Sequence, residues 1–222
     1  MDSKVLQRIT TELPSGTRLV AVSKYHPAEA ILEAYQAGQR IFGESHVQEL
    51  QVKQAQLPTD IQWHFIGHLQ TNKVKYIAPY VSLIHSVDSP RLLDEINRQA
   101  LRAGRRIPCL LQIHVAQEET KFGFLPDELI EFLRSGHWHT LEGVEIAGLM
   151  CMASNTDDEA QIESEFARAQ HLFDQLKNEF FTAQPTFCER SWGMSHDYPI
   201  ALRCGATLVR IGSLIFGDRV YL

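Results

Sequence analysis

One lysine in the sequence stands where an amine could be used for chemistry. Lys24 lies in "LVAVSKYHP", residues 19–27, directly after an apolar, strand-like run. A lysine at the end of a buried strand can form an imine with an aldehyde, provided that desolvation or a nearby cation lowers its pKa from about 10.4. Such a lysine can also be a solvated charge or half of a salt bridge. The residue alone leaves these roles open.

Two segments near the end of the sequence have features of an anion site. "GMSHD", residues 193–197, predicts a glycine turn into a helix capped by Ser195, and the N-terminal end of a helix attracts phosphate. "VRIGSLIFG", residues 209–217, supplies a strand, then Gly212 for close backbone approach and the hydroxyl of Ser213. An ordinary turn and an ordinary helix cap would give the same patterns. Whether the two segments form an anion site therefore depends on where they lie in the fold.

Arg210 is a charge inside an otherwise apolar strand, two residues before Gly212. A buried charge needs a partner or a ligand. The side chain could face the ring nitrogen of a bound cofactor and keep it unprotonated, or it could pair with a carboxylate elsewhere. A lysine beside a phosphate site could form an imine with a phosphorylated aldehyde, and pyridoxal 5'-phosphate is such a compound.

The elements that must position these residues alternate regularly along the sequence. After a helix at about residues 2–12, within an N-terminal segment 1–13, eight β-rich stretches alternate with helical ones. We expect the strands at residues 18–23, 40–43, 62–67, 81–86, 108–115, 144–150, 186–189 and 208–212. This order predicts a single-domain (β/α)8 TIM-type barrel over residues 1–222, with an open doubly wound sheet as the competing architecture. In a barrel, Lys24 and both anion-binding segments would meet at one face.

The composition favours a globular protein with a small-molecule ligand. The 222 residues are 44% hydrophobic and carry a net charge of -6, which argues against nucleic-acid and anionic-membrane partners. The sequence has neither a leader-like N-terminus nor an apolar run long enough to span a membrane, so we expect a cytoplasmic location. Four widely spaced cysteines predict reduced thiols, of which Cys109 and Cys151 lie in apolar runs and suit packing roles.

Other motifs favour structural roles. His137 with His139, and His64 with His68, lack the further ligands that a zinc site needs, so no metal is expected. No glycine-rich nucleotide motif follows a predicted strand. Apolar residues recur at helical spacing within 157–180, which indicates a helix packed on the barrel.

Seven motifs in register resemble one known family. They are "AVSKYHP", "FGESHVQEL", "WHFIGHLQTNK", "TKFGF", "GLMCMA", "WGMSHDYPIAL" and "VRIGSLIFG", and they run from about residue 19 to 217. Together they resemble the pyridoxal phosphate homeostasis proteins, single-domain relatives of the barrel of fold-type III alanine racemases.

The resemblance implies a role for several residues. Lys24 aligns with the lysine that forms the internal aldimine with pyridoxal phosphate, and Arg210 aligns with the arginine near the pyridine nitrogen. The remaining cofactor-binding positions implied are Ser195, Gly212 and Ser213 at the phosphate, Met150 and Met194 beside the cofactor, and Ser45, His64 and Asn72 close to the pocket. Two residues depart from the family pattern: Ser45 replaces a usual asparagine and Trp192 a usual methionine. Neither departure touches the lysine or the phosphate positions, so we expect binding to survive.

The implied function is cofactor binding without evident catalysis. The family resemblance suggests a role in vitamin B6 homeostasis and in amino-acid and keto-acid balance, with pyridoxal-phosphate-requiring apoenzymes as recipients. Racemases similar to this protein draw a second base from a β-rich domain, which a sequence ending at Leu222 is not expected to supply, so we also expect a monomer. The alternatives are a low-activity racemase or other pyridoxal-phosphate enzyme, with His64, His68 or a loop residue as second base, and a cofactor-independent phosphosugar-binding barrel.

Overall fold

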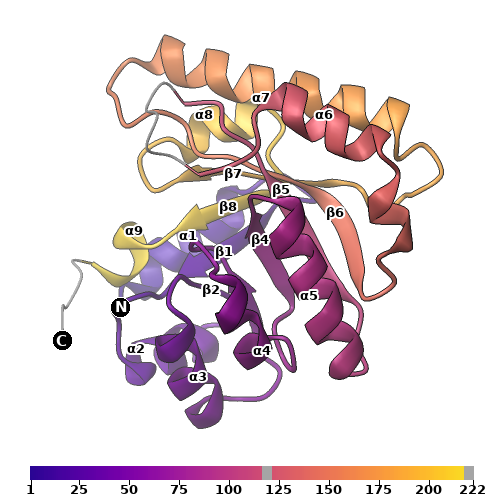
Figure 1. Cartoon of the computed structure of the whole chain (residues 1–222). Coiled ribbons are helices and arrows are strands. Elements are labelled where there is room, and N and C mark those ends of the chain that lie inside the picture. Colours follow the sequence, from indigo (N-terminus) through magenta and orange to yellow (C-terminus); the bar gives the residue numbers. More distant parts are fainter. Residues whose placement is uncertain (117–121, 218–222) are drawn as a thin grey trace.

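Eight parallel strands close into a barrel that helices cover from outside (Figure 1). The computed structural model describes residues 1–116 and 122–217. The strands are β1 (Arg18–Val22), β2 (Ile41–Glu44), β3 (Gln62–Phe65), β4 (Leu83–Val87), β5 (Ile107–Gln112), β6 (Val144–Met150), β7 (Glu189–Met194) and β8 (Leu208–Ile211). Each strand pairs with the next, and β8 returns to β1. The predicted (β/α)8 barrel is therefore confirmed against an open sheet.

One helix precedes β1, the others alternate with the strands in sequence, and the last follows β8. They are α1 (Ser3–Glu12), α2 (Ala28–Gln36), α3 (Val47–Gln56), α4 (Val74–Ile77), α5 (Pro90–Arg102), α6 (Pro126–Arg134), α7 (Glu159–Glu179), α8 (Tyr198–Arg203) and α9 (Ser213–Phe216), with short 3-10 helices η1 (Thr71–Lys73) and η2 (His137–Thr140). The predicted N-terminal helix is present as α1, where the Asp2 carboxylate accepts the N–H groups of Lys4 and Val5 at 3.0 Å. Such a cap satisfies donors that have no partner within the helix.

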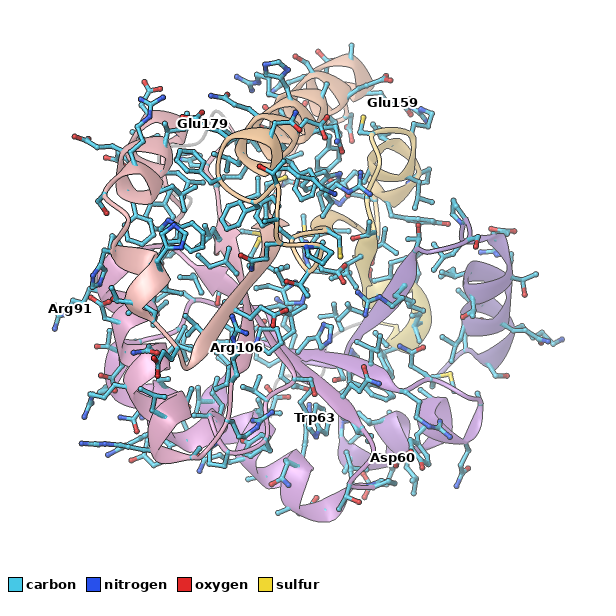
Figure 2. The ribbon with its side chains drawn as sticks, turned by 90° about the vertical axis from the view of Figure 1, so that its right-hand side faces the viewer. Asp60, Trp63, Arg91, Arg106, Glu159 and Glu179 are labelled. Atoms are coloured by element: carbon cyan, nitrogen blue, oxygen red, sulfur yellow. The ribbon has the colours of Figure 1, made fainter. Side chains whose placement is uncertain are left out.

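The hydrophobic core has two parts. The larger part packs the outer face of the barrel against the helices. The predicted apolar stripe of α7 belongs to it, and Ile162, Phe166, Ala169, Leu172, Phe173 and Leu176 are all buried. Charged side chains lie on the outside of the helical layer, as Arg91, Glu159 and Glu179 show (Figure 2).

The smaller part of the core fills the barrel itself, as side chains from alternate strands do in such folds. Its buried apolar members come from five strands: Val20, Leu83, Leu110, Ala147, Met150 and Leu208. No helix in the described ranges is long and apolar enough to cross a membrane.

The seventh strand lies further along the chain than the sequence indicated. The sequence predicts this strand at residues 186–189 and a glycine turn at Gly193, whereas β7 spans Glu189–Met194. Gly193 instead lies inside β7 with φ +91°, and a Cβ at this position would come within 2.6 Å of Ala201 Cβ. A glycine is needed here so that β7 and α8 can pack closely.

Candidate functional site

A cavity of about 320 Å³ opens where several barrel strands end. Val22 ends β1, Met194 ends β7, and Gly212 directly follows β8, and all three line the cavity. In TIM barrels this face carries the ligand site. The volume falls at the lower end of the range for small-molecule sites, about 300–1,000 Å³.

Most of the predicted site residues meet around this cavity. Those that line it are Lys24, Ser45, Met194, Ser195, Arg210, Gly212 and Ser213. The others lie elsewhere: Met150 is buried inside the barrel, His64 is buried in β3, and Asn72 is exposed in η1. A larger cavity of about 650 Å³ lies between α6 and α7 and contains none of the predicted residues, so size alone would not have located the site.

Lys24 sits in a tight turn just beyond β1. The backbone N–H of His26 donates to the Ser23 carbonyl at 3.1 Å, and Lys24 is half-buried between them. Tyr25 has φ +65°, in the left-handed region that non-glycine residues rarely adopt. Such a backbone costs about 1–3 kcal/mol and persists only where surrounding contacts fix it.

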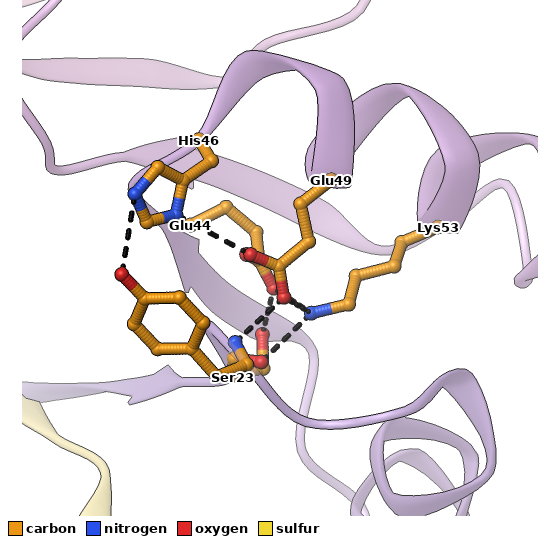
Figure 3. A network of polar contacts seen from close by, with 6 residues as sticks. Ser23, Glu44, His46, Glu49 and Lys53 are labelled. Atoms are coloured by element: carbon orange, nitrogen blue, oxygen red, sulfur yellow. Dashed lines mark hydrogen bonds and ion pairs between the residues drawn. The ribbon is translucent and has the colours of Figure 1, made fainter. Parts of the chain in front are cut away.

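A buried polar network holds this turn (Figure 3). The Lys53 ammonium group, on α3, donates to the Ser23 carbonyl at 2.8 Å and to carboxylate oxygens of Glu44 and Glu49 at 2.7 Å each. Glu49 Oε1 also accepts the backbone N–H of Tyr25 at 2.6 Å, and Ser23 Oγ donates to Glu44 Oε1 at 2.6 Å. The network therefore links the ends of β1 and β2 to α3.

Glu44 is the most deeply buried acid of this network. Burial raises its pKa from 4.5 to about 7, even though the neighbouring Lys53 charge acts in the opposite direction. Its second carboxylate oxygen, Oε2, is buried and has no hydrogen-bond partner among the described residues. An uncharged carboxyl group fits that surrounding better than an ionised one.

Arg210 is buried and held by neutral oxygen atoms. Its guanidinium group donates to the carbonyl and the hydroxyl of Ser191 at 2.6 Å each and to the Cys151 carbonyl at 2.8 Å. Burial lowers the pKa of Arg210. These bonds fix the orientation of the side chain, which also lines the cavity. Within residues 1–116 and 122–217, the oxygen atoms that hold Arg210 are those of Ser191 and Cys151, and none belongs to a carboxylate.

Two buried histidines continue this arrangement into the barrel. Ser191 Oγ lies 2.8 Å from His85 Nδ1, and His85 Nε2 lies 2.9 Å from His64 Nδ1. Burial lowers the pKa of His64 to about 3 and that of His85 well below its usual value. Both rings are therefore neutral near pH 7, and His64 serves as part of an interior hydrogen-bonded column.

Ser195 does not cap a helix, contrary to the sequence prediction. Asp197 occupies the N-cap position of α8, and its carboxylate accepts the Met194 N–H at 2.5 Å. The Ser195 hydroxyl instead accepts the backbone N–H of Gly212 at 3.2 Å. Ser195 thus ties the loop after β7 to the loop after β8.

Glycine lets two loops approach closely at this face. A Cβ on Gly212 would lie 2.9 Å from the Val22 carbonyl oxygen, at the end of β1. A Cβ on Gly67 would lie 2.4 Å from the Ser45 carbonyl oxygen. The positions of both cavity-lining loops therefore depend on the absence of side chains.

Sequence reasoning missed some of the lining residues. The cavity also includes Val22, His26, Ile66, Met152, His196 and Gly217. Ile66 directly follows β3, and Met152 comes two residues after the end of β6. The rule that ligands bind after barrel strands therefore indicates both residues. Trp192 is fully buried in the outer core and does not line the cavity.

Within residues 1–116 and 122–217, no group of three or more His, Cys, Asp or Glu side chains could hold a metal ion.

Comparison with known proteins gives consistent matches over nearly the whole chain. The family model of the alanine racemase N-terminal domain matches residues 4–220. A pyridoxal phosphate homeostasis protein of Aquifex aeolicus is 40% identical over 99% of this chain and 97% of its own length. The protein of that name from Bos taurus is 38% identical over 98% of this chain and 83% of its own length.

Solved structures agree with these matches. PipY of Synechococcus elongatus without PLP superposes with a TM-score of 0.91 at 38% identity, covering 98% of this chain and 100% of that one. PipY with PLP bound gives a TM-score of 0.89, also at 38% identity, covering 97% of this chain and 99% of that one. Alanine racemase from Bartonella henselae, at 17% identity and a TM-score of 0.73 over 99% of this chain and 60% of that one, shares the fold. By sequence and by structure, the chain belongs to the family of pyridoxal phosphate homeostasis proteins.

Proposed function

We propose that the chain binds pyridoxal 5'-phosphate in the cavity at the ends of β1, β7 and β8. The proposal rests on one observation: an amine, a buried guanidinium and three serine hydroxyls line one small cavity. This donor set suits a ligand with an aldehyde, an aromatic nitrogen and a phosphate. The names of the relatives and the PLP-bound structure of PipY support the same ligand.

Each group has a distinct role in the proposal. Lys24 would hold the cofactor through its amine, which would condense with the aldehyde to an imine with loss of water. Ser195 and Ser213 hold the phosphate. Arg210, already oriented by Ser191, faces the pyridine nitrogen and keeps it unprotonated, which weakens the ring as an electron sink. Ser45 borders the same cavity, so its short hydroxyl replaces the usual asparagine at the edge of the site.

We further propose that the protein holds and releases the cofactor rather than catalysing racemisation. A racemase needs two bases on opposite faces of the substrate. The two histidines named as candidates for the second base, His64 and His68, do not line the cavity. His64 is buried, neutral and absent from the cavity lining, while His68 Nδ1 lies 3.0 Å from Asp88 and does not line the cavity either. The proposed biological role is vitamin B6 homeostasis, with delivery to pyridoxal-phosphate-requiring apoenzymes.

Titration of the cofactor-free protein with pyridoxal phosphate tests this function. We expect wild-type protein to gain the absorbance band of a protonated imine, and Lys24→Ala to lack it while still folding. Failure of the wild-type protein to gain the band would contradict covalent binding and favour a phosphosugar-binding barrel. Incubation of the loaded protein with enantiopure alanine tests catalysis: turnover abolished by Lys24→Ala would contradict the carrier role.

The state and location of the protein complete the proposal. A monomer is the proposed state, and the exposed charged residues Arg91, Glu159 and Glu179 on the outside of the helical layer are consistent with it (Figure 2). A cytoplasmic location is supported by the cysteines, because Cys109, Cys151, Cys188 and Cys204 carry thiols, as expected in a reducing compartment. Size-exclusion chromatography with light scattering tests the first statement, and cell fractionation tests the second.

A further inference from the structure

We propose that Glu49 and Lys53 are positioning residues that hold the backbone on both sides of Lys24. The proposal rests on the function proposed above for Lys24 and assigns part of that function to helix α3. Figure 3 shows both side chains reaching from α3 toward the turn that follows β1. Neither residue lines the cavity.

The contacts reach the two peptide groups that flank the Lys24 Cα atom. Lys53 Nζ donates to the Ser23 carbonyl at 2.8 Å, and this carbonyl belongs to the peptide group before Lys24. Glu49 Oε1 accepts the Tyr25 N–H at 2.6 Å, and this N–H belongs to the peptide group after Lys24. With both peptide groups held, the direction in which the Lys24 side chain leaves the backbone is fixed.

The conformation of Tyr25 shows why contacts that hold the turn are needed. Its φ of +65° is unfavourable for a tyrosine, so the turn would relax without contacts that hold it. Besides the bond to its N–H, the Tyr25 ring packs on His46 with centroids 5.1 Å apart, and His46 Nδ1 lies 3.4 Å from Glu49 Oε2. Glu49 therefore contacts the turn directly and through His46.

The burial of Lys53 is consistent with a positioning role rather than a contribution to stability. Its side chain is 6% exposed, and its ammonium group lies 2.7 Å from a carboxyl oxygen of Glu44 and 2.7 Å from one of Glu49, which is one helical turn away on α3. Buried ion pairs of this kind stabilise a fold little more than apolar residues of similar size would. They do fix geometry, because each charged group accepts only a few orientations.

The test compares four variants with wild-type protein. Glu49→Leu removes the acceptor of the Tyr25 N–H, whereas Glu49→Gln keeps an acceptor oxygen and removes the charge. Gln39→Met is the matched control, because Gln39 Nε2 also bridges β1 and β2 through the carbonyls of Leu19 and Ile41, at the opposite end of these strands. Lys53→Met removes the second contact independently.

Two quantities are measured for each variant. The first is amide hydrogen exchange of Tyr25 in cofactor-free protein, and the second is the rate constant for covalent capture of pyridoxal phosphate. We expect Glu49→Leu to accelerate exchange and to slow capture by about tenfold or more, the factor for losing a hydrogen bond to a charged group. We expect Lys53→Met to slow capture similarly, and Glu49→Gln and Gln39→Met to stay within about threefold of wild type.

The outcomes separate this proposal from the function on which it rests. Capture and exchange in both Glu49→Leu and Lys53→Met equal to those of Gln39→Met would overturn the positioning role. Absence of capture by wild-type protein would overturn the proposed function, while the exchange measurement would still decide whether Glu49 holds the turn. If Glu49→Leu does not fold, Lys53→Met supplies the same comparison.

Discussion

The stability of the protein is expected to fall as the pH rises through neutrality, because of Glu44. The folded state raises the pKa of this buried carboxyl from 4.5 to about 7, so between these values it holds a proton that the unfolded chain has lost. Stability from this group is therefore fully present below about pH 4.5 and is lost as the pH rises through about 7. Since one pKa unit corresponds to about 1.4 kcal/mol, the full loss is about 3 kcal/mol.

Urea denaturation of wild-type protein and of Glu44→Gln, carried out from about pH 5 to pH 8, measures this effect. The glutamine has nearly the shape of the protonated acid and does not titrate. We expect the wild-type free energy of unfolding to fall relative to that of Glu44→Gln by up to about 3 kcal/mol over this range. A constant difference, or a wild-type protein that gains relative stability with rising pH, would show that Glu44 is ionised throughout and that Lys53 outweighs the cost of burial.

Three further changes test the site and the core. Arg210→Met leaves the Ser191 and Cys151 oxygens without their donor and should lower the free energy of unfolding by about 1–3 kcal/mol, measured by urea denaturation; an unchanged value would contradict the assigned contacts. Gly212→Ala places a Cβ 2.9 Å from the Val22 carbonyl oxygen and should weaken pyridoxal phosphate binding about tenfold by titration, whereas Gly104→Ala, with open space at its Cβ, should not. Phe166→Ala, in the fully buried stripe of α7, should cost about 3–5 kcal/mol in unfolding free energy, against less than about 0.5 kcal/mol for exposed Leu101→Ala.

The barrel was predictable because its signal is local. Strands such as β1 are short apolar runs, and helices such as α5 begin at a side-chain cap, so alternation along the sequence was enough to give the fold. The seventh strand was misplaced because Gly193 resembles a turn in sequence. A glycine is needed at this position because Ala201 packs against it, and that contact forms only in the folded protein.

Site residues that lie directly after predicted strands could be predicted from the sequence. Contacts between side chains that are far apart in the sequence could not. Lys24 and Ser213 could be found from their places after strands. The contact between Glu44 and Lys53 joins β2 to α3, and no spacing in the sequence indicates it. The column formed by His64 and His85 is likewise a product of tertiary packing.

The identity of the residue that captures the cofactor tests the central claim most directly. Protein loaded with pyridoxal phosphate is reduced with borohydride, digested and analysed by peptide mass spectrometry. We expect a reduced pyridoxyl-phosphate group on Lys24 alone. Modification of another lysine, or no modification of any peptide, would contradict it.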